Sequence, residues 1–282
     1  MKKFRKVVLV LMVCLFAVLG TGCGVYANVK TSMNQGGTKV SVTESFGWDE
    51  KSIEELCGII DMSKDEFIGQ ISNTEGVSCK RKKMYGEYYY VVTATVKGVK
   101  LSAAEEGMED LGLSDVCYTS DCFYAKLPAM GSMSEMLGYD ELLDKDNLSA
   151  EERKQFEQLV EELNNAELHG NLTIAFNKPV KASNGEIDGK TVTWSYDKLS
   201  KQKYLYASTK NAKSTAKISG IAKNKTYKIG KKIAVKNPSS VAKLTLNGKA
   251  VKNGTAITAP GSYTVKVWSM DGKYQQIKFK VK

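Results

Sequence analysis

The chain has 282 residues, of which 42% are hydrophobic and 26% are charged. The hydrophobic fraction is large enough to bury a core, so the composition excludes a predominantly polar chain. The formal net charge of +10 is distributed unevenly. Residues 24–210 carry 21 basic and 30 acidic side chains, a net charge of −9, whereas residues 211–282 carry 16 lysines and one acid, a net charge of +15. The contrast predicts an acidic body followed by a separate, strongly basic domain.

Residues 1–22 have the features of a secretory signal. Four positive charges within the first six residues precede 13 uncharged, mostly apolar residues, 7–19. That run is shorter than the about 20 residues of a membrane-spanning helix. The small residues before Cys23 resemble the bacterial lipobox, although Leu19 lies one position earlier than in its commonest form. The resemblance implies cleavage before Cys23, lipidation of Cys23 and anchoring on the outer face of the cell membrane. An ordinary signal peptide and an uncleaved anchor are the alternatives.

Four cysteines follow the signal and are candidates for disulfides: Cys57, Cys79, Cys117 and Cys122. An even number of cysteines in an exported chain favours disulfides, and four cysteines allow three pairings. The close spacing of Cys117 and Cys122 favours a bridge across a tight turn, which would leave Cys57 with Cys79. Free buried thiols are the alternative. No metal site is expected, because the cysteines lack C-x-x-C spacing and His169 is the only histidine.

Strands and short helices are predicted to alternate up to residue 130. Residues 24–47 alternate weakly between apolar and polar side chains, which predicts a strand. Residues 49–72 have helical spacing, with a capping box from Ser63 to Glu66. A second capping box, from Ser102 to Glu105, predicts another short helix. Residues 116–130 are again predicted to form a strand.

A basic cluster, Lys80-Arg81-Lys82-Lys83, precedes the predicted strand 88–96. Lysines on a hairpin edge discourage pairing with other chains, and this is the favoured interpretation of the cluster. Contact with phospholipid is the alternative.

The middle of the chain predicts a loop and then the strongest helix. Residues 128–148 carry methionines, which suits either a mobile lid or an ordinary loop. The helix follows from residue 149, and His169 is expected at its end, where it would either cap carbonyls or be solvated. The sequence has no Gly-x-Ser-x-Gly elbow and no phosphate-binding loop. It therefore predicts no catalytic residue, no cofactor and no enzymatic activity.

The rest of the chain predicts strands. Residues 171–180, 191–194 and 204–207 have strand character, and residues 210–218 are the expected linker. Four alternating segments then follow at 232–235, 242–246, 262–268 and 275–281, separated by Asn-Gly, Pro-Gly and Asp-Gly turns. Short strands with regularly spaced turn signals predict a small β-sandwich.

Two family resemblances follow from these motifs. The Phe-Asn-Lys-Pro-Val segment at 176–180 and the hairpin Asn184-Gly-Glu-Ile-Asp-Gly-Lys-Thr-Val-Thr-Trp194 resemble the LppM-type domain of bacterial lipoproteins. Asn224-Lys-Thr-Tyr227, Thr245-Leu-Asn-Gly-Lys249 and Pro260-Gly-Ser-Tyr-Thr-Val265 resemble the small immunoglobulin-like repeats of Gram-positive surface proteins. The expected fold class is α+β. It consists of a signal peptide (1–22), a mixed-strand LppM-like domain with packed helices (23–210) and an all-β immunoglobulin-like sandwich (211–282).

The resemblances imply a non-catalytic binding module at the cell surface, with a lipid or glycolipid as the candidate ligand of the first domain. The basic domain is expected to contact an anionic cell-wall polymer or the membrane surface. Its candidate contacts are Lys231, Lys232, Lys243, Lys249, Lys266, Lys278 and Lys280. Lysines that only keep the domain soluble are the alternative, and export argues against nucleic acid. A structural or adhesive protein, or an accessory envelope protein that contacts another protein, is the alternative function.

Overall fold

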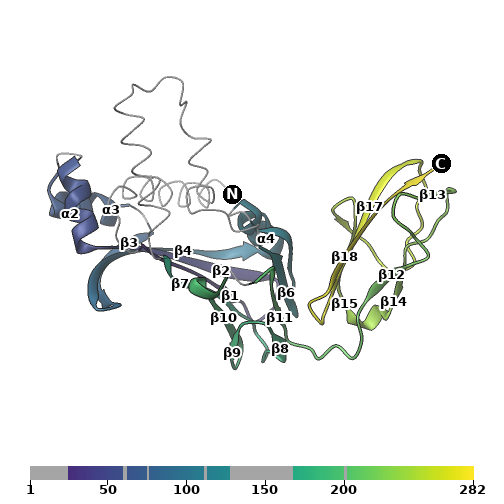
Figure 1. Cartoon of the computed structure of the whole chain (residues 1–282), viewed down its shortest axis with the longest axis horizontal. Helices are drawn as coiled ribbons and strands as arrows, with labels where there is room; N and C mark the ends of the chain where they lie inside the picture. Colours follow the sequence, from purple (N-terminus) through teal and green to yellow (C-terminus); the bar gives the residue numbers. More distant parts are fainter. Residues whose placement is uncertain (1–24, 60–61, 75, 111–112, 128–167, 200–201) are drawn as a thin grey trace, which may run out of the picture.

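The computed structural model describes residues 25–59, 62–74, 76–110, 113–127, 168–199 and 202–282 (Figure 1). This part of the chain is mostly β, with 53% strand and 14% helix. The expected α+β domain with packed helices is therefore wrong. The described helices are short and lie beside long strands that dominate the packing. The lid and the helix predicted over 128–167 fall outside the described residues.

A seven-stranded sheet forms the centre of the N-terminal part, in the order β3-β4-β2-β1-β7-β10-β9. Its strands are β1 (Val25–Met33), β2 (Lys39–Asp49), β3 (Val77–Met84), β4 (Glu87–Lys100), β7 (Leu168–Ala175), β9 (Glu186–Asp188) and β10 (Thr191–Ser195). Neighbouring strands are antiparallel except for the parallel pair β1 and β7. The hairpin of β3 and β4 thus provides one edge of the sheet.

Short helices pack against this sheet. They are α2 (Glu50–Ile59), α3 (Lys64–Ser72), α4 (Leu101–Asp110) and α8 (Tyr196–Leu199). The helix start predicted at Ser63 is confirmed, because the Ser63 side chain caps α3 by accepting a hydrogen bond of 3.3 Å from the Glu66 N–H. The second predicted capping box is wrong, since α4 begins at Leu101 and Ser102 lies inside the helix. Glu105 instead accepts a hydrogen bond of 2.6 Å from the Tyr118 N–H.

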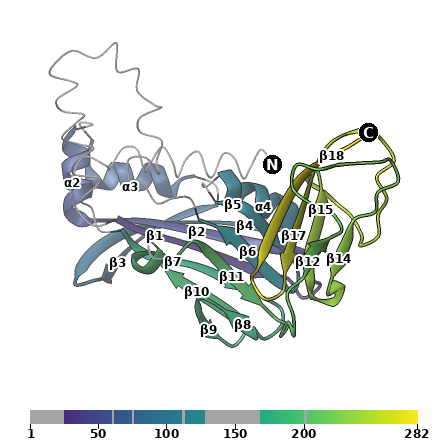
Figure 2. The same ribbon diagram turned by 45° about the vertical axis from the view of Figure 1, so that its right-hand side comes forward.

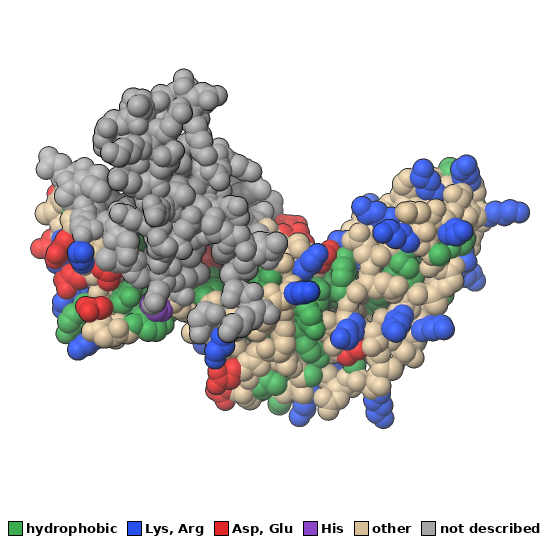
Figure 3. All heavy atoms as spheres, viewed as in Figure 1, with side chains coloured by type: hydrophobic (Ala, Val, Ile, Leu, Met, Phe, Trp, Pro, Cys, Tyr) green, Lys and Arg blue, Asp and Glu red, His purple; other side chains and the backbone are tan. Residues whose placement is uncertain are grey.

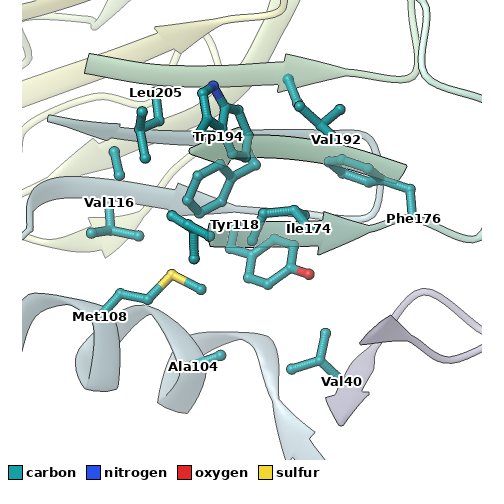
Figure 4. Close-up of a cluster of buried hydrophobic side chains, with 14 of the residues drawn as sticks. Val40, Ala104, Met108, Val116, Tyr118, Ile174, Phe176, Val192, Trp194 and Leu205 are labelled. Carbon is teal, nitrogen blue, oxygen red and sulfur yellow. The ribbon is translucent and has the colours of Figure 1, made fainter. Parts of the chain in front are cut away.

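A four-stranded sheet covers part of the first, in the order β5-β6-β11-β8. Its strands are β5 (Ser114–Tyr118), β6 (Cys122–Lys126), β8 (Ala182–Ser183) and β11 (Tyr204–Ser208). The main core lies between the two sheets, with Ala104 and Met108 of α4 beside it (Figure 4). The Phe123 ring lies 5.5 Å from Tyr118 and 5.7 Å from Trp194, measured between centroids. These rings fill the middle of the core.

A second apolar cluster lies where α2 and α3 pack on the seven-stranded sheet. Trp48, Ile53, Cys57, Ile71 and Val92 are all buried there. The cluster stabilises the end of the sheet from which the β3–β4 hairpin projects.

The C-terminal part is all β and has its own core. Its strands are β12 (Lys217–Ser219), β13 (Thr226–Tyr227), β14 (Ala234–Lys236), β15 (Val241–Leu246), β16 (Lys249–Ala250), β17 (Gly261–Ser269) and β18 (Tyr274–Val281), with a 3-10 turn at Pro238–Ser240. They form a five-stranded sheet, β13-β18-β17-β15-β16, and a two-stranded sheet, β12-β14. Val265, Val267, Ile277 and Phe279 are buried, as the alternating pattern predicts, and Lys278 is exposed.

Candidate functional site

The four-stranded sheet and the five-stranded sheet meet through their outer faces, and we call this contact the joint (Figure 2). Cys117, Tyr124, Tyr206 and Trp268 are buried in it. The Tyr124 ring stacks on Tyr204 at 5.6 Å and on Tyr274 at 5.8 Å, so a column of three rings crosses from one part of the chain to the other. Burial and the nearby Asp115 carboxylate raise the pKa of Tyr124 to about 12.

Asp115 is the polar centre of the joint. Its carboxylate accepts hydrogen bonds from Lys266 Nζ at 2.6 Å and from the Tyr274 hydroxyl at 2.8 Å. Its carbonyl oxygen accepts a third bond, from Trp268 Nε1, at 2.8 Å. Asp115 lies at an irregularity of β5 and has a φ of 52°. Aspartate tolerates the left-handed region better than most residues, and bulges of this kind re-aim side chains.

A second ion pair lies beside the first. Lys243 Nζ donates to both carboxylate oxygens of Glu105, at 2.8 and 2.7 Å. The Tyr206 hydroxyl donates to the Met270 carbonyl at 2.9 Å. Gly272 lies so close to the Tyr206 ring that a Cβ atom there would come within 2.6 Å of it. Charged, polar and apolar contacts therefore all hold the C-terminal part against the N-terminal part.

Two of the predicted polymer contacts are consequently corrected. Lys243 and Lys266 are committed to Glu105 and Asp115 within the chain, so they do not form a free basic surface. Sequence reasoning missed this role, because the partners lie 138 and 151 positions apart in the chain.

The other predicted lysines lie outside the joint. Lys232, Lys249, Lys278 and Lys280 are exposed, and Lys231 is partly buried with its Nζ 4.7 Å from the Tyr227 ring centroid. Lys278 and Lys280 lie on β18 beyond the joint. Lys225 was not predicted, yet it is exposed and its carbonyl accepts a hydrogen bond of 2.9 Å from the Lys280 N–H. The sequence did not single out Lys225, because the adjacent strand β13 has only two residues, too few for an alternating pattern.

The candidate disulfides are not formed in the structure. Cys117 and Cys122 are free thiols with no exposed surface. Burial and the neighbouring Cys122 thiol raise the pKa of Cys117 well above its ordinary value. Cys57 is a buried free thiol, and Cys79 packs at the margin of the same apolar cluster. Buried thiols of this kind pack as small apolar side chains.

His169 lies in β7, not at the end of a helix, and its ring stacks on Tyr85 at 4.2 Å. Among the described residues, no group of three or more His, Cys, Asp and Glu side chains is arranged to hold a metal ion. In the same part of the chain, no helix is long and apolar enough to cross a membrane. Cys23, the candidate lipidation site, precedes the first described residue.

No family model, no curated protein and no solved structure matches this chain.

Proposed function

We propose that this chain is a lipid-anchored surface protein without catalytic activity, and that it holds a basic C-terminal domain against an anionic envelope polymer. The joint is the observation that carries this proposal. A spacer with freely moving domains has no need of two ion pairs and a column of stacked tyrosines between them. The contacts instead present the basic domain in one orientation.

The lysines that remain outside the joint supply the charge. Thirteen of the 16 lysines in residues 211–282 are exposed: Lys213, Lys217, Lys223, Lys225, Lys228, Lys232, Lys236, Lys249, Lys252, Lys273, Lys278, Lys280 and Lys282. Figure 3 shows lysines spread over the visible face of this domain. One sign of charge spread over a surface attracts polyanions without demanding a specific sequence or shape.

The position of this domain favours a polymer over the membrane surface. Figure 1 places the β3–β4 hairpin and the C-terminal domain at opposite ends of the longest axis. The first strand, β1, begins at Val25, next to the hairpin end of the sheet, because Val25, Trp48, Tyr90 and Arg81 lie in one row. A lipid on Cys23 would therefore anchor the end of the molecule that lies far from the basic domain.

The described core does not favour a lipid or glycolipid inside the N-terminal domain. Tyr118, Phe123 and Trp194 are buried, the Phe123 ring contacts the other two, and an inserted acyl tail would have to displace them. Close-packed interiors resist such displacement. The binding that we propose is therefore at the surface.

Polymer binding is tested with a chain that starts at residue 23 and carries Cys23→Ser. All described elements begin at Val25 or later, so this chain retains them. We expect it to bind purified polyglycerol phosphate, with an affinity that falls as NaCl is raised. Replacing Lys249, Lys278 and Lys280 by glutamine should weaken binding roughly tenfold.

A matched variant replaces Lys80, Lys82 and Lys83 by glutamine and should bind the polymer as the parent does. Equal loss in both variants, or no binding at all, would contradict the polymer proposal and favour an adhesive or accessory protein. Anchoring is tested separately by mass spectrometry, which gives the intact mass of the protein expressed from the full-length chain and extracted from membranes. A diacylglycerol adduct that disappears in Cys23→Ser is the expected result, and its absence would contradict the anchor.

A further inference from the structure

The β3–β4 hairpin combines exposed cations with exposed aromatic rings. Lys80, Arg81, Lys82 and Lys83 are all exposed along β3. Tyr85 and Tyr88, at the tip, are 56% and 42% exposed. Only two other large hydrophobic side chains in the described ranges are so exposed, and each lies alone on a different strand or loop.

Strand register places this hairpin at the end of the sheet where the chain enters. Val25 pairs with Trp48, Trp48 with Tyr90, and Tyr90 with Arg81. At about 4.8 Å between neighbouring strands, Arg81 lies roughly 14 Å across the sheet from Val25. Strand β4 begins at Glu87, three residues before this row, and the tip bends back over the sheet, because the Tyr85 ring stacks on His169, the partner of Tyr26 in the pairing of β7 with β1.

The anchor lies close to that end. Cys23 precedes Val25 by two residues, and two extended residues span at most about 7 Å. This step rests on the lipid anchor of the proposed function. A lipid on Cys23 would keep the hairpin within about 20 Å of the bilayer surface at all times.

The cations of the hairpin divide into two groups. Arg81 is held within the chain: it donates to Glu50 at 2.7 Å, and its guanidinium lies 3.7 Å from the Tyr88 ring centroid. Lys80, Lys82 and Lys83 are exposed, and no ion pair with a described carboxylate is recorded for them. Arg81 therefore orients the tip, while Lys80, Lys82 and Lys83 keep exposed side chains that an external anion could reach.

We propose that this hairpin contacts the anionic phospholipid surface in which the chain is anchored. Lysines near a negatively charged bilayer gain electrostatic attraction, and tyrosine prefers the level of the headgroups. Protection of the sheet edge accounts for the lysines, but not for the tyrosines at the tip. Tyr85 stacks on His169 and Tyr88 on Arg81, yet each tyrosine keeps about half of its surface exposed. The contact would fix the tilt of the molecule, with the basic C-terminal domain pointing away from the membrane.

The test uses the chain from residue 23 with Cys23→Ser, so that no lipid anchor contributes to binding. Sedimentation with phosphatidylcholine vesicles is compared with sedimentation with vesicles that contain phosphatidylglycerol as well. We expect binding to the anionic vesicles only, lost at high salt. Replacing Lys80, Lys82 and Lys83 by glutamine should weaken it about a hundredfold.

The matched control replaces Lys249, Lys278 and Lys280 by glutamine. Because the basic domain is itself attracted to polyanions, this variant should weaken vesicle binding, but by much less than the hairpin variant. A hairpin variant that binds like the parent would overturn the inference, as would loss only in the control. Because the lipid anchor is absent, these outcomes do not depend on Cys23. Failure of the proposed function would instead appear as a missing diacylglycerol adduct or missing polymer binding.

Discussion

At the scale of single residues, buried or half-buried carboxylates tie loops to sheets. Asp121 lies in the turn between β5 and β6, and its carboxylate accepts from Lys178 at 3.0 Å, from Thr209 at 2.9 Å and from Lys210 at 2.8 Å. The last two residues begin the segment that leads to the C-terminal domain. The start of this segment is therefore held by one acid.

Burial raises the pKa of Asp121, but hydrogen bonds from Lys210, Lys178 and Thr209 outweigh burial and lower it to about 2. A carboxyl group whose pKa is lower in the folded state than in the unfolded state stabilises the fold at pH values above the unfolded pKa. This stabilisation is lost as the pH falls through the folded-state pKa. We therefore expect the free energy of unfolding to fall between about pH 4 and pH 2. Urea denaturation should show a smaller fall for Asp121→Asn. An equally steep fall in the variant would exclude Asp121 as the source, and Asp188→Asn, at an exposed acid on β9, is the control.

At the scale of elements, the joint depends on the turn between β17 and β18. Gly272 has a φ of 76°, and an added Cβ would lie 2.6 Å from the Tyr206 ring. Gly248 has a similar φ of 79°, with nothing within 4 Å of an added Cβ. Substituting Gly248 by alanine therefore introduces backbone strain alone, whereas the same substitution at Gly272 adds a steric clash at the joint.

Gly272→Ala should destabilise the protein by about 2–4 kcal/mol, the sum of left-handed strain and overpacking. Gly248→Ala carries the strain alone and should cost about 1 kcal/mol. Chemical denaturation measures both values. Equal losses in the two variants would show that the Tyr206 ring can move aside freely and that the joint is not closely packed there.

Much of the strand pattern was predictable from sequence, but the joint was not. Alternation placed Val265, Val267, Ile277 and Phe279 in the core, since these positions follow a period of two. Trp268 lies on the opposite face of β17, and an aromatic side chain among polar ones was the available signal that this face is covered. The left-handed φ of Asp115 and its partners 151 to 159 positions away leave no local signature. The packed helices were overestimated because capping boxes and apolar spacing report local preference, whereas long-range strand pairing decided the fold.

At the scale of the whole molecule, the joint decides whether the two parts unfold together. Each part has its own apolar core, so each could in principle open separately. Trp268 is 3% exposed, lies 5.3 Å from the Tyr274 ring and donates to the Asp115 carbonyl, so it connects the aromatic and polar contacts of the joint. The connecting segment offers trypsin two exposed lysines, Lys210 and Lys213.

Trp268→Ala should therefore uncouple the two parts. Truncating a buried tryptophan costs about 3–5 kcal/mol, and here the loss falls on the contact between the cores. We expect calorimetry of the chain from residue 23 with Cys23→Ser to show one transition for the parent and two for the variant, with faster tryptic cleavage after Lys210 or Lys213. Ile229→Ala, at a side chain that is 53% exposed, removes apolar surface far from the joint and should keep the single transition. Two transitions in the parent itself would mean that the joint is too weak to orient the basic domain. The polymer contact would then have to act through a mobile tether, with an affinity that is insensitive to Trp268.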